Sequence, residues 1–183
     1  MVYKFDYLGD LCRSFCKIIQ KYTKYIVVSG FLVIMSGRSR ATEDIDIIIK
    51  PIDLNTFIKL HKELVQNQFQ CLQSSDPIEI FSRYLKENLP VRYIKNGNFI
   101  PNIELKFAKD KLDEYQILTR KKIPFTEIDI FFSSIEANIA FKEELLKSPK
   151  DLDDAKHLRI VYSDDLDEKE IEKIKKMIHK FRL

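Results

Sequence analysis

The chain has 183 residues, of which 45% are hydrophobic and 32% charged, and its net charge is +3. This balance excludes a disordered chain and permits nucleotide or nucleic acid partners without requiring them. No apolar stretch reaches the ~18 residues that a membrane span requires, so we expect no membrane association and a cytoplasmic location. The three cysteines are odd in number and lack CxxC spacing, which argues against a disulfide framework or a zinc ribbon.

The first third of the sequence predicts alternating helices and strands. Apolar residues recur at helical spacing over 8–22, and the β-branched run 25–29 predicts a buried strand that ends at Gly30. We expect Asp53 and Asp76 to cap helices, with Pro77 in the first helical turn. The further elements expected are helices over 31–35, 53–67 and 77–87, and strands over 44–50 and 69–72.

The middle of the sequence continues this mixture. Two strands, 91–95 and 103–107, are expected around a turn that contains Asn96-Gly97. A helix over 109–120 and an extended segment over 123–128 follow.

From Ser133 onward only helical patterns remain, in segments near 135–146, 152–162 and 167–181. The sequence therefore predicts an α/β (α+β) domain over residues 1–132, followed by a helical C-terminal lobe over residues 133–183.

The segment from Val27 to Lys50 carries the most informative pattern. A strand carries Asp44 and Asp46 two positions apart, so both side chains project from one face. Two carboxylates this close repel each other, and a divalent cation resolves the conflict. Hard oxygen ligands select Mg²⁺ or Mn²⁺, ions that also contact nucleotide phosphates.

The residues before this strand suit an anion. Gly30 lets the backbone approach a phosphate, and the N–H groups of the following helix can bind it. Ser29 offers a hydroxyl, while Arg38 and Arg40 offer charge-assisted hydrogen bonds. Taken singly, a pair of aspartates is usually a surface feature and a Ser-Gly pair only a turn. Their combination and order favour a functional site.

This segment resembles the polymerase-beta-type nucleotidyltransferase superfamily, in which a glycine-serine or glycine-glycine turn precedes a DxD strand. It is most similar to AbiEii-like toxins and related small nucleotidyltransferases. The family usually begins the turn with glycine, whereas Ser29 stands there in this chain, and Glu43 is inserted before the first aspartate. The matching residues are Arg40, Thr42, Asp44 and Asp46.

The C-terminal half adds a second resemblance, to the helical segment of the same family. By resemblance, Lys142 contacts the nucleotide phosphates and Asp151 helps to arrange the site. The matching residues are Ile135, Glu136, Lys142, Lys150, Asp151 and Asp154.

The superfamily also places a third acid on a later strand, and Glu104 is the best candidate. It alternates with Ile103 and Leu105, so it faces away from them. A third carboxylate would act as a general base or complete a metal site. The alternative is a charged residue on the solvent face of an edge strand.

The resemblance implies a nucleotidyltransferase fold, with a short mixed sheet flanked by helices. It also implies transfer of a nucleoside monophosphate from an NTP to an RNA, protein or small-molecule acceptor. By analogy with the family, the protein would be the toxin of a toxin–antitoxin pair. A catalytically degenerate member that binds a nucleotide, RNA or protein is the alternative, and Ser29 favours it. The implied nucleotide-binding residues are Ser29, Gly30, Arg38, Arg40, Thr42, Lys142 and Asp151, and the implied catalytic and metal-binding residues are Asp44, Asp46 and Glu104.

Overall fold

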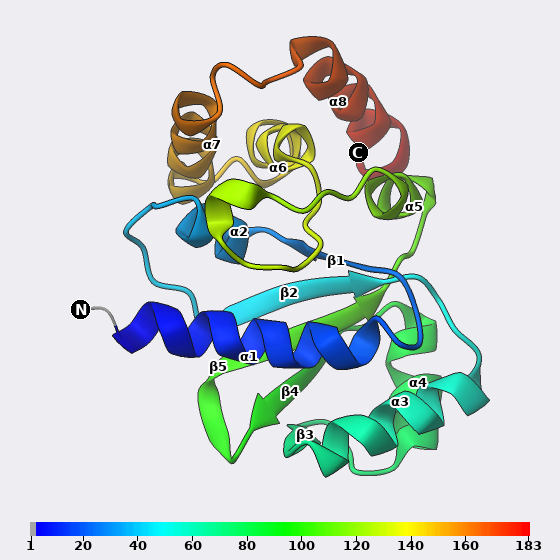
Figure 1. The fold of residues 1–183 in the computed structure, drawn as a ribbon. Coiled ribbons are helices and arrows are strands. Elements are labelled where there is room, and N and C mark those ends of the chain that lie inside the picture. Colours follow the sequence, from blue (N-terminus) through cyan, green and yellow to red (C-terminus); the bar gives the residue numbers. More distant parts are fainter. Residues whose placement is uncertain (1–2) are drawn as a thin grey trace.

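One mixed sheet of five strands organises the chain (Figure 1). The computed structural model describes residues 3–183, with side chains from Tyr7 onward. The strand order is β1-β2-β5-β4-β3, in which β2 and β5 run parallel and the other neighbouring pairs are antiparallel. The strands are β1 (Tyr25–Val28), β2 (Asp44–Ile49), β3 (Phe69–Cys71), β4 (Val91–Lys95) and β5 (Asn98–Phe107).

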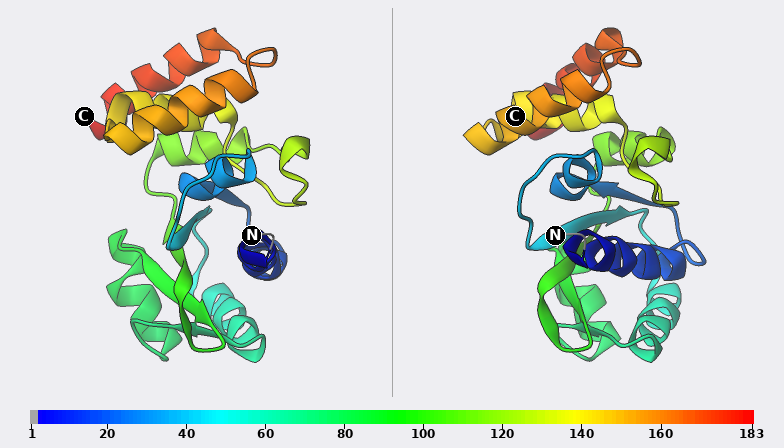
Figure 2. Two further views of the ribbon diagram at one scale, coloured as in Figure 1. Left: turned by 90° about the vertical axis from the view of Figure 1, so that its left-hand side faces the viewer. Right: turned by 60° about the vertical axis from the view of Figure 1, so that its left-hand side comes forward.

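Helices cover both faces of this sheet, and the last three helices form a layer beyond β1 and α2 (Figures 1 and 2). The helices are α1 (Tyr3–Ile19), α2 (Gly30–Met35), α3 (Leu54–Gln66), α4 (Pro77–Arg83), α5 (Lys111–Leu118), α6 (Ile135–Phe141), α7 (Pro149–Val161) and α8 (Glu168–Arg182). Two 3₁₀ turns span η1 (Leu85–Glu87) and η2 (Pro124–Thr126), and a π-helical turn, η3 (Lys142–Leu146), continues α6. The expected α/β class, with a short mixed sheet flanked by helices, is confirmed.

The two faces of β2 have different chemistry because side chains alternate along a strand. Ile45, Ile47 and Ile49 are fully buried in the main core. On the same side of the sheet, Phe15 of α1 packs edge-on against Phe69 with a centroid distance of 4.9 Å. The opposite face carries Asp44, Asp46 and Ile48. The small apolar cluster of Ile26, Ile48, Ala108 and Ile117 covers only part of this second face.

Local sequence signals place most element boundaries correctly. Asp53 accepts a hydrogen bond from the Thr56 N–H, and Asp76 accepts one from the Ile78 N–H, so both predicted caps are confirmed. The helix expected over 109–120 is shorter, because Asp110 caps it and its first residue is Lys111. The strand expected over 103–107 is longer and begins at Asn98, directly after the Asn96-Gly97 turn. The three cysteines are buried free thiols.

The extended segment expected over 123–128 is wrong. Pro124 begins a 3₁₀ turn, which the Thr126 hydroxyl closes by donating to the Ile123 carbonyl at 2.7 Å. Glu127 then takes a left-handed conformation with φ 55°, which reverses the chain. Ile123 and Ile128 are buried on either side of this turn, so their apolar character reflects burial and not a strand.

The proposed division between residues 132 and 133 stays a prediction, and polar contacts cross it. Arg182 near the end of α8 contacts Asp110 and Asp113, each at 2.7 Å.

In the part of the chain that the structure describes, no helix combines the length and the apolar character that crossing a membrane requires.

Candidate active site

Three carboxylates meet where β2 and β5 run side by side. In the parallel register, Asp46 lies opposite Glu104, and Asp44 lies opposite Asn102. Paired residues of neighbouring strands project to the same face, so this register brings together the acids of both strands. One carboxylate oxygen from each of Asp44, Asp46 and Glu104 lies within 4.8 Å of the others. We call these three residues the acid cluster.

The acid cluster is electrostatically unsatisfied. Burial, the charge of Asp44 and the charge of Glu104 raise the pKa of Asp46 to about 6, although Lys106 and a hydrogen bond from Ser29 act against this shift. Arg92 is the only cation paired with the cluster among the described residues; it is half exposed and 3.6 Å from Glu104. Three converging hard oxygen donors with so little compensating charge fit Mg²⁺ or Mn²⁺.

The turn before α2 brings Ser29 next to Asp46. Ser29 has φ 66° and ψ −135°, a backbone conformation that side chains rarely tolerate and that glycine adopts readily. Its N–H donates to Asn138 Oδ1 at 3.0 Å, and its side chain lies beside Asp46 and lowers the pKa of that carboxyl. The backbone therefore has the shape expected of the family's usual glycine, while the serine adds a hydroxyl beside the acid cluster.

Gly30 permits a close approach within the protein. A Cβ atom at this position would lie 2.7 Å from Nη2 of Arg40. From the sequence we expected a phosphate to approach the backbone at Gly30. In the structure the Arg40 guanidinium lies next to Gly30.

A second charged group ties the loop after α2 to α7. Asp154 is fully buried and accepts hydrogen bonds from Arg38 and Arg40, and from the Lys142 Nζ at 2.9 Å. Lys142 is 1% exposed and also donates to Asp151 at 3.2 Å. We call these five residues the Asp154 cluster.

Sequence reasoning matched Asp154 to a family motif but gave it no role. Its position three residues after Asp151 on a helix was the available signal, because that spacing puts both carboxylates on one face. Thr42 also has a local role, since its hydroxyl donates to the Asp44 carbonyl at 3.0 Å and fixes the loop that enters β2.

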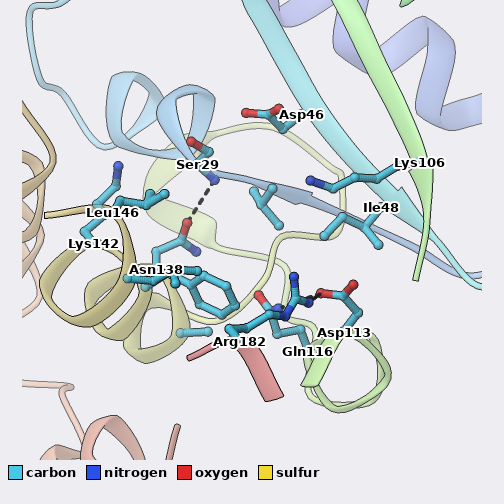
Figure 3. Close-up of a pocket in the computed structure, with 14 residues that line it drawn as sticks. Ser29, Asp46, Ile48, Lys106, Asp113, Gln116, Asn138, Lys142, Leu146 and Arg182 are labelled. Carbon is cyan, nitrogen blue, oxygen red and sulfur yellow. Dashed lines mark hydrogen bonds and ion pairs between the residues drawn. The ribbon is translucent and has the colours of Figure 1, made fainter. Parts of the chain in front are cut away.

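A cavity of about 300 Å³ opens between the sheet and the helical layer, beside Asp46 (Figure 3). Of the predicted residues, Ser29, Asp46 and Lys142 line it, whereas Gly30, Asp44, Glu104, Arg38, Arg40, Thr42 and Asp151 do not. The remaining wall is apolar near Phe141 and Leu145. Five further polar or charged residues that the predicted site did not include also line it, namely Lys106, Asp113, Gln116, Asn138 and Arg182.

No protein-family model and no curated protein matches this sequence. Solved structures do match. The antibiotic-resistance factor ANT(2'')-Ia has a TM-score of 0.54 and 10% identity, over 96% of this chain and 92% of that protein. An antigenic nucleotidyltransferase-like protein from Paracoccidioides brasiliensis has a TM-score of 0.54 and 13% identity, over 98% of this chain and 89% of that protein. At this identity the likeness concerns the fold, and the chain therefore has the fold of the nucleotidyltransferases.

Proposed function

We propose that this protein is a metal-dependent nucleotidyltransferase that transfers a nucleoside monophosphate from an NTP to an acceptor and releases pyrophosphate. The observation that carries the proposal is the convergence of Asp44, Asp46 and Glu104 beside the Ser29-Gly30 turn. The shared fold supports it, as does the cavity next to Asp46.

The acid cluster would hold Mg²⁺ or Mn²⁺. When bound, such an ion supplies charge neutralisation at the phosphates and aligns them for in-line attack. Glu104 would complete this site or accept the proton of the attacking hydroxyl. Ser29 would donate its hydroxyl to a phosphate, a contact that its position beside Asp46 supports.

The triphosphate would meet the Asp154 cluster. Arg38, Arg40 and Lys142 are paired with Asp154, Asp151 and the exposed Asp153, and a phosphate would compete with these carboxylates for the N–H donors. Asp154 would hold these cations ready, which reduces the entropy lost when phosphate binds. Gly30 and Thr42 would act indirectly, by shaping the turn and the loop. The apolar wall near Phe141 and Leu145 would contact the base.

The finer assignment to AbiEii-like enzymes rests on Arg40, Thr42, Asp44 and Asp46. If this assignment holds, the acceptor would be an RNA, a protein or a small molecule, and the protein would be the toxin that pairs with an antitoxin. Under this assignment, induced expression arrests growth and Asp46→Ala relieves the arrest.

The direct test follows the label from each α-³²P-labelled NTP. The protein is incubated with Mg²⁺ and, separately, with total RNA, protein or small molecules from cells. We expect transfer to one of these fractions and at least a ~1,000-fold loss with Asp46→Asn, because the variant lacks a metal ligand. Glu43→Gln is the matched control: it removes an exposed carboxylate that belongs to a neighbouring residue and lies outside the acid cluster.

A binder without catalysis gives a different pattern. Calorimetry with each NTP, with and without Mg²⁺, then reports metal-dependent binding that Asp44→Ala abolishes, while no fraction acquires label. Absence of both binding and labelling would contradict the proposed function altogether.

A further inference from the structure

Three cations line the cavity beside the acid cluster, and two of them are already neutralised. Lys142 is buried against Asp151 and Asp154, and Arg182 is paired with Asp110 and Asp113. For Lys106 no hydrogen-bond acceptor or ion-pair partner is found among residues 7–183. Lys106 is therefore the cavity cation whose charge remains available to a ligand.

The strand register fixes where this charge lies. Lys106 follows Glu104 by two positions on β5 and stands opposite Ile48, which follows Asp46 by two positions on β2. Two residues advance a strand by about 7 Å, so Lys106 projects from the face that bears the acid cluster, one step further along the strand. Figure 3 shows Lys106 and Asp46 on the same side of the cavity.

The Lys106 ammonium acts on the charge of Asp46 but forms no ion pair with it, and such an ammonium in a partly buried cavity favours an anionic ligand. Lysine is a compact point charge with three donors on a flexible stem, which suits a phosphate oxygen. The Ser29 hydroxyl lies on the other side of Asp46, so a phosphate next to the acid cluster would lie between these two donors.

We propose that Lys106 contacts the phosphate of the NTP that lies nearest the acid cluster, as a substrate-binding residue. This proposal rests on the proposed nucleotidyltransferase function and adds a residue to it. It also assigns the cavity to the nucleotide and not to the acceptor.

The proposal predicts effects of opposite sign on metal and on nucleotide in Lys106→Met. Removal of a positive charge beside three carboxylates strengthens binding of Mn²⁺ alone by about threefold. Loss of a charge-assisted hydrogen bond weakens binding of the α,β-methylene analogue of the preferred NTP by roughly 10- to 100-fold. The corresponding nucleoside, which has no phosphate, binds with unchanged affinity.

Two further variants serve as controls for this measurement. Lys109→Met removes the same charge from an exposed residue that does not line the cavity, and it leaves all three affinities unchanged. Lys106→Arg keeps the charge and retains most of the nucleotide affinity. Thermal unfolding shows whether each variant is folded, and Lys106→Arg carries the comparison if Lys106→Met does not fold.

Three results would overturn the proposal. Equal weakening of Mn²⁺ and nucleotide binding would mean that Lys106 only maintains the acid cluster. Unchanged nucleotide binding in Lys106→Met, with binding abolished by Asp46→Asn, would leave the proposed function standing and remove Lys106 from it. A wild-type protein that binds no NTP would overturn both.

Discussion

The acid cluster and the Asp154 cluster differ in the balance between carboxylates and cations. In the acid cluster, three carboxylates converge with only the half-exposed Arg92 paired to them. In the Asp154 cluster, three cations are paired with the fully buried Asp154 and with two further carboxylates, Asp151 and Asp153. The first arrangement leaves charge for a ligand to neutralise, and the second leaves little. The difference supports the proposed metal binding at the acid cluster and a role for Asp154 in holding the three cations in place.

The largest effect is expected from Asp154→Asn. This change leaves three cations around a neutral amide, and we expect it to lower the free energy of unfolding by about 3–5 kcal/mol. Asp153→Asn is the matched control, because that carboxylate is 71% exposed and lies 3.6 Å from Arg38. We expect it to change stability by less than about 0.5 kcal/mol. Urea unfolding of both variants measures the contrast, and equal effects would contradict a holding role for Asp154.

Asp46→Asn should act in the opposite direction on stability. It removes a carboxylate that burial and its neighbours disfavour, so the metal-free protein should unfold at a higher temperature at pH 7. It also removes a metal ligand, so Mn²⁺ affinity should fall about 100-fold or more. Paired unfolding and Mn²⁺ titrations check this reversal. Loss of both stability and metal affinity would make Asp46 a structural acid.

The pH dependence of metal binding follows from the pKa of Asp46, which is raised to about 6. Metal requires the ionised carboxylate, so Mn²⁺ affinity should be constant above this pH and fall by up to about tenfold per pH unit below it. Because the pKa is higher in the folded state, ionisation of Asp46 also lowers the stability of the metal-free protein as pH rises from about 4 to 6. Mn²⁺ titrations from pH 5 to 8 test the first statement, and a flat profile would contradict it. Urea unfolding of the metal-free protein from pH 4 to 7 tests the second, and stability that does not fall over this range would contradict it.

Ser29 offers the smallest and most specific contrast. Ser29→Gly should raise the free energy of unfolding by about 1 kcal/mol, because glycine adopts the φ of 66° without strain. Ser29→Ala should give no such gain, because it keeps the strained backbone. Both variants lose the hydroxyl that lowers the pKa of Asp46, so the pH midpoint of Mn²⁺ binding should move upward in each. A stability gain with alanine would show that the backbone is not the source of the strain.

Much of this molecule follows from local pattern. The two-residue repeat of a strand puts Asp44 and Asp46 on one face wherever that strand packs, and Asp53 and Asp76 satisfy the N–H groups of the helices that follow them. These features involve residues within a few positions of each other, so the sequence alone determines them. The 3₁₀ turn at Pro124 shows the limit, because buried isoleucines on either side of a turn resemble a strand.

Only the tertiary structure decided which distant groups meet. The parallel register of β2 and β5 places Glu104 beside Asp46, although the two residues are 58 positions apart in the sequence. It also puts Lys106, which is 60 positions from Asp46, in the wall of the same cavity. Arg38 reaches Asp154 across 116 positions. Such contacts depend on strand order and helix packing, which no local periodicity encodes. The sequence thus determined which residues carry charge, and packing decided which of those charges are neutralised by the protein and which remain for a ligand.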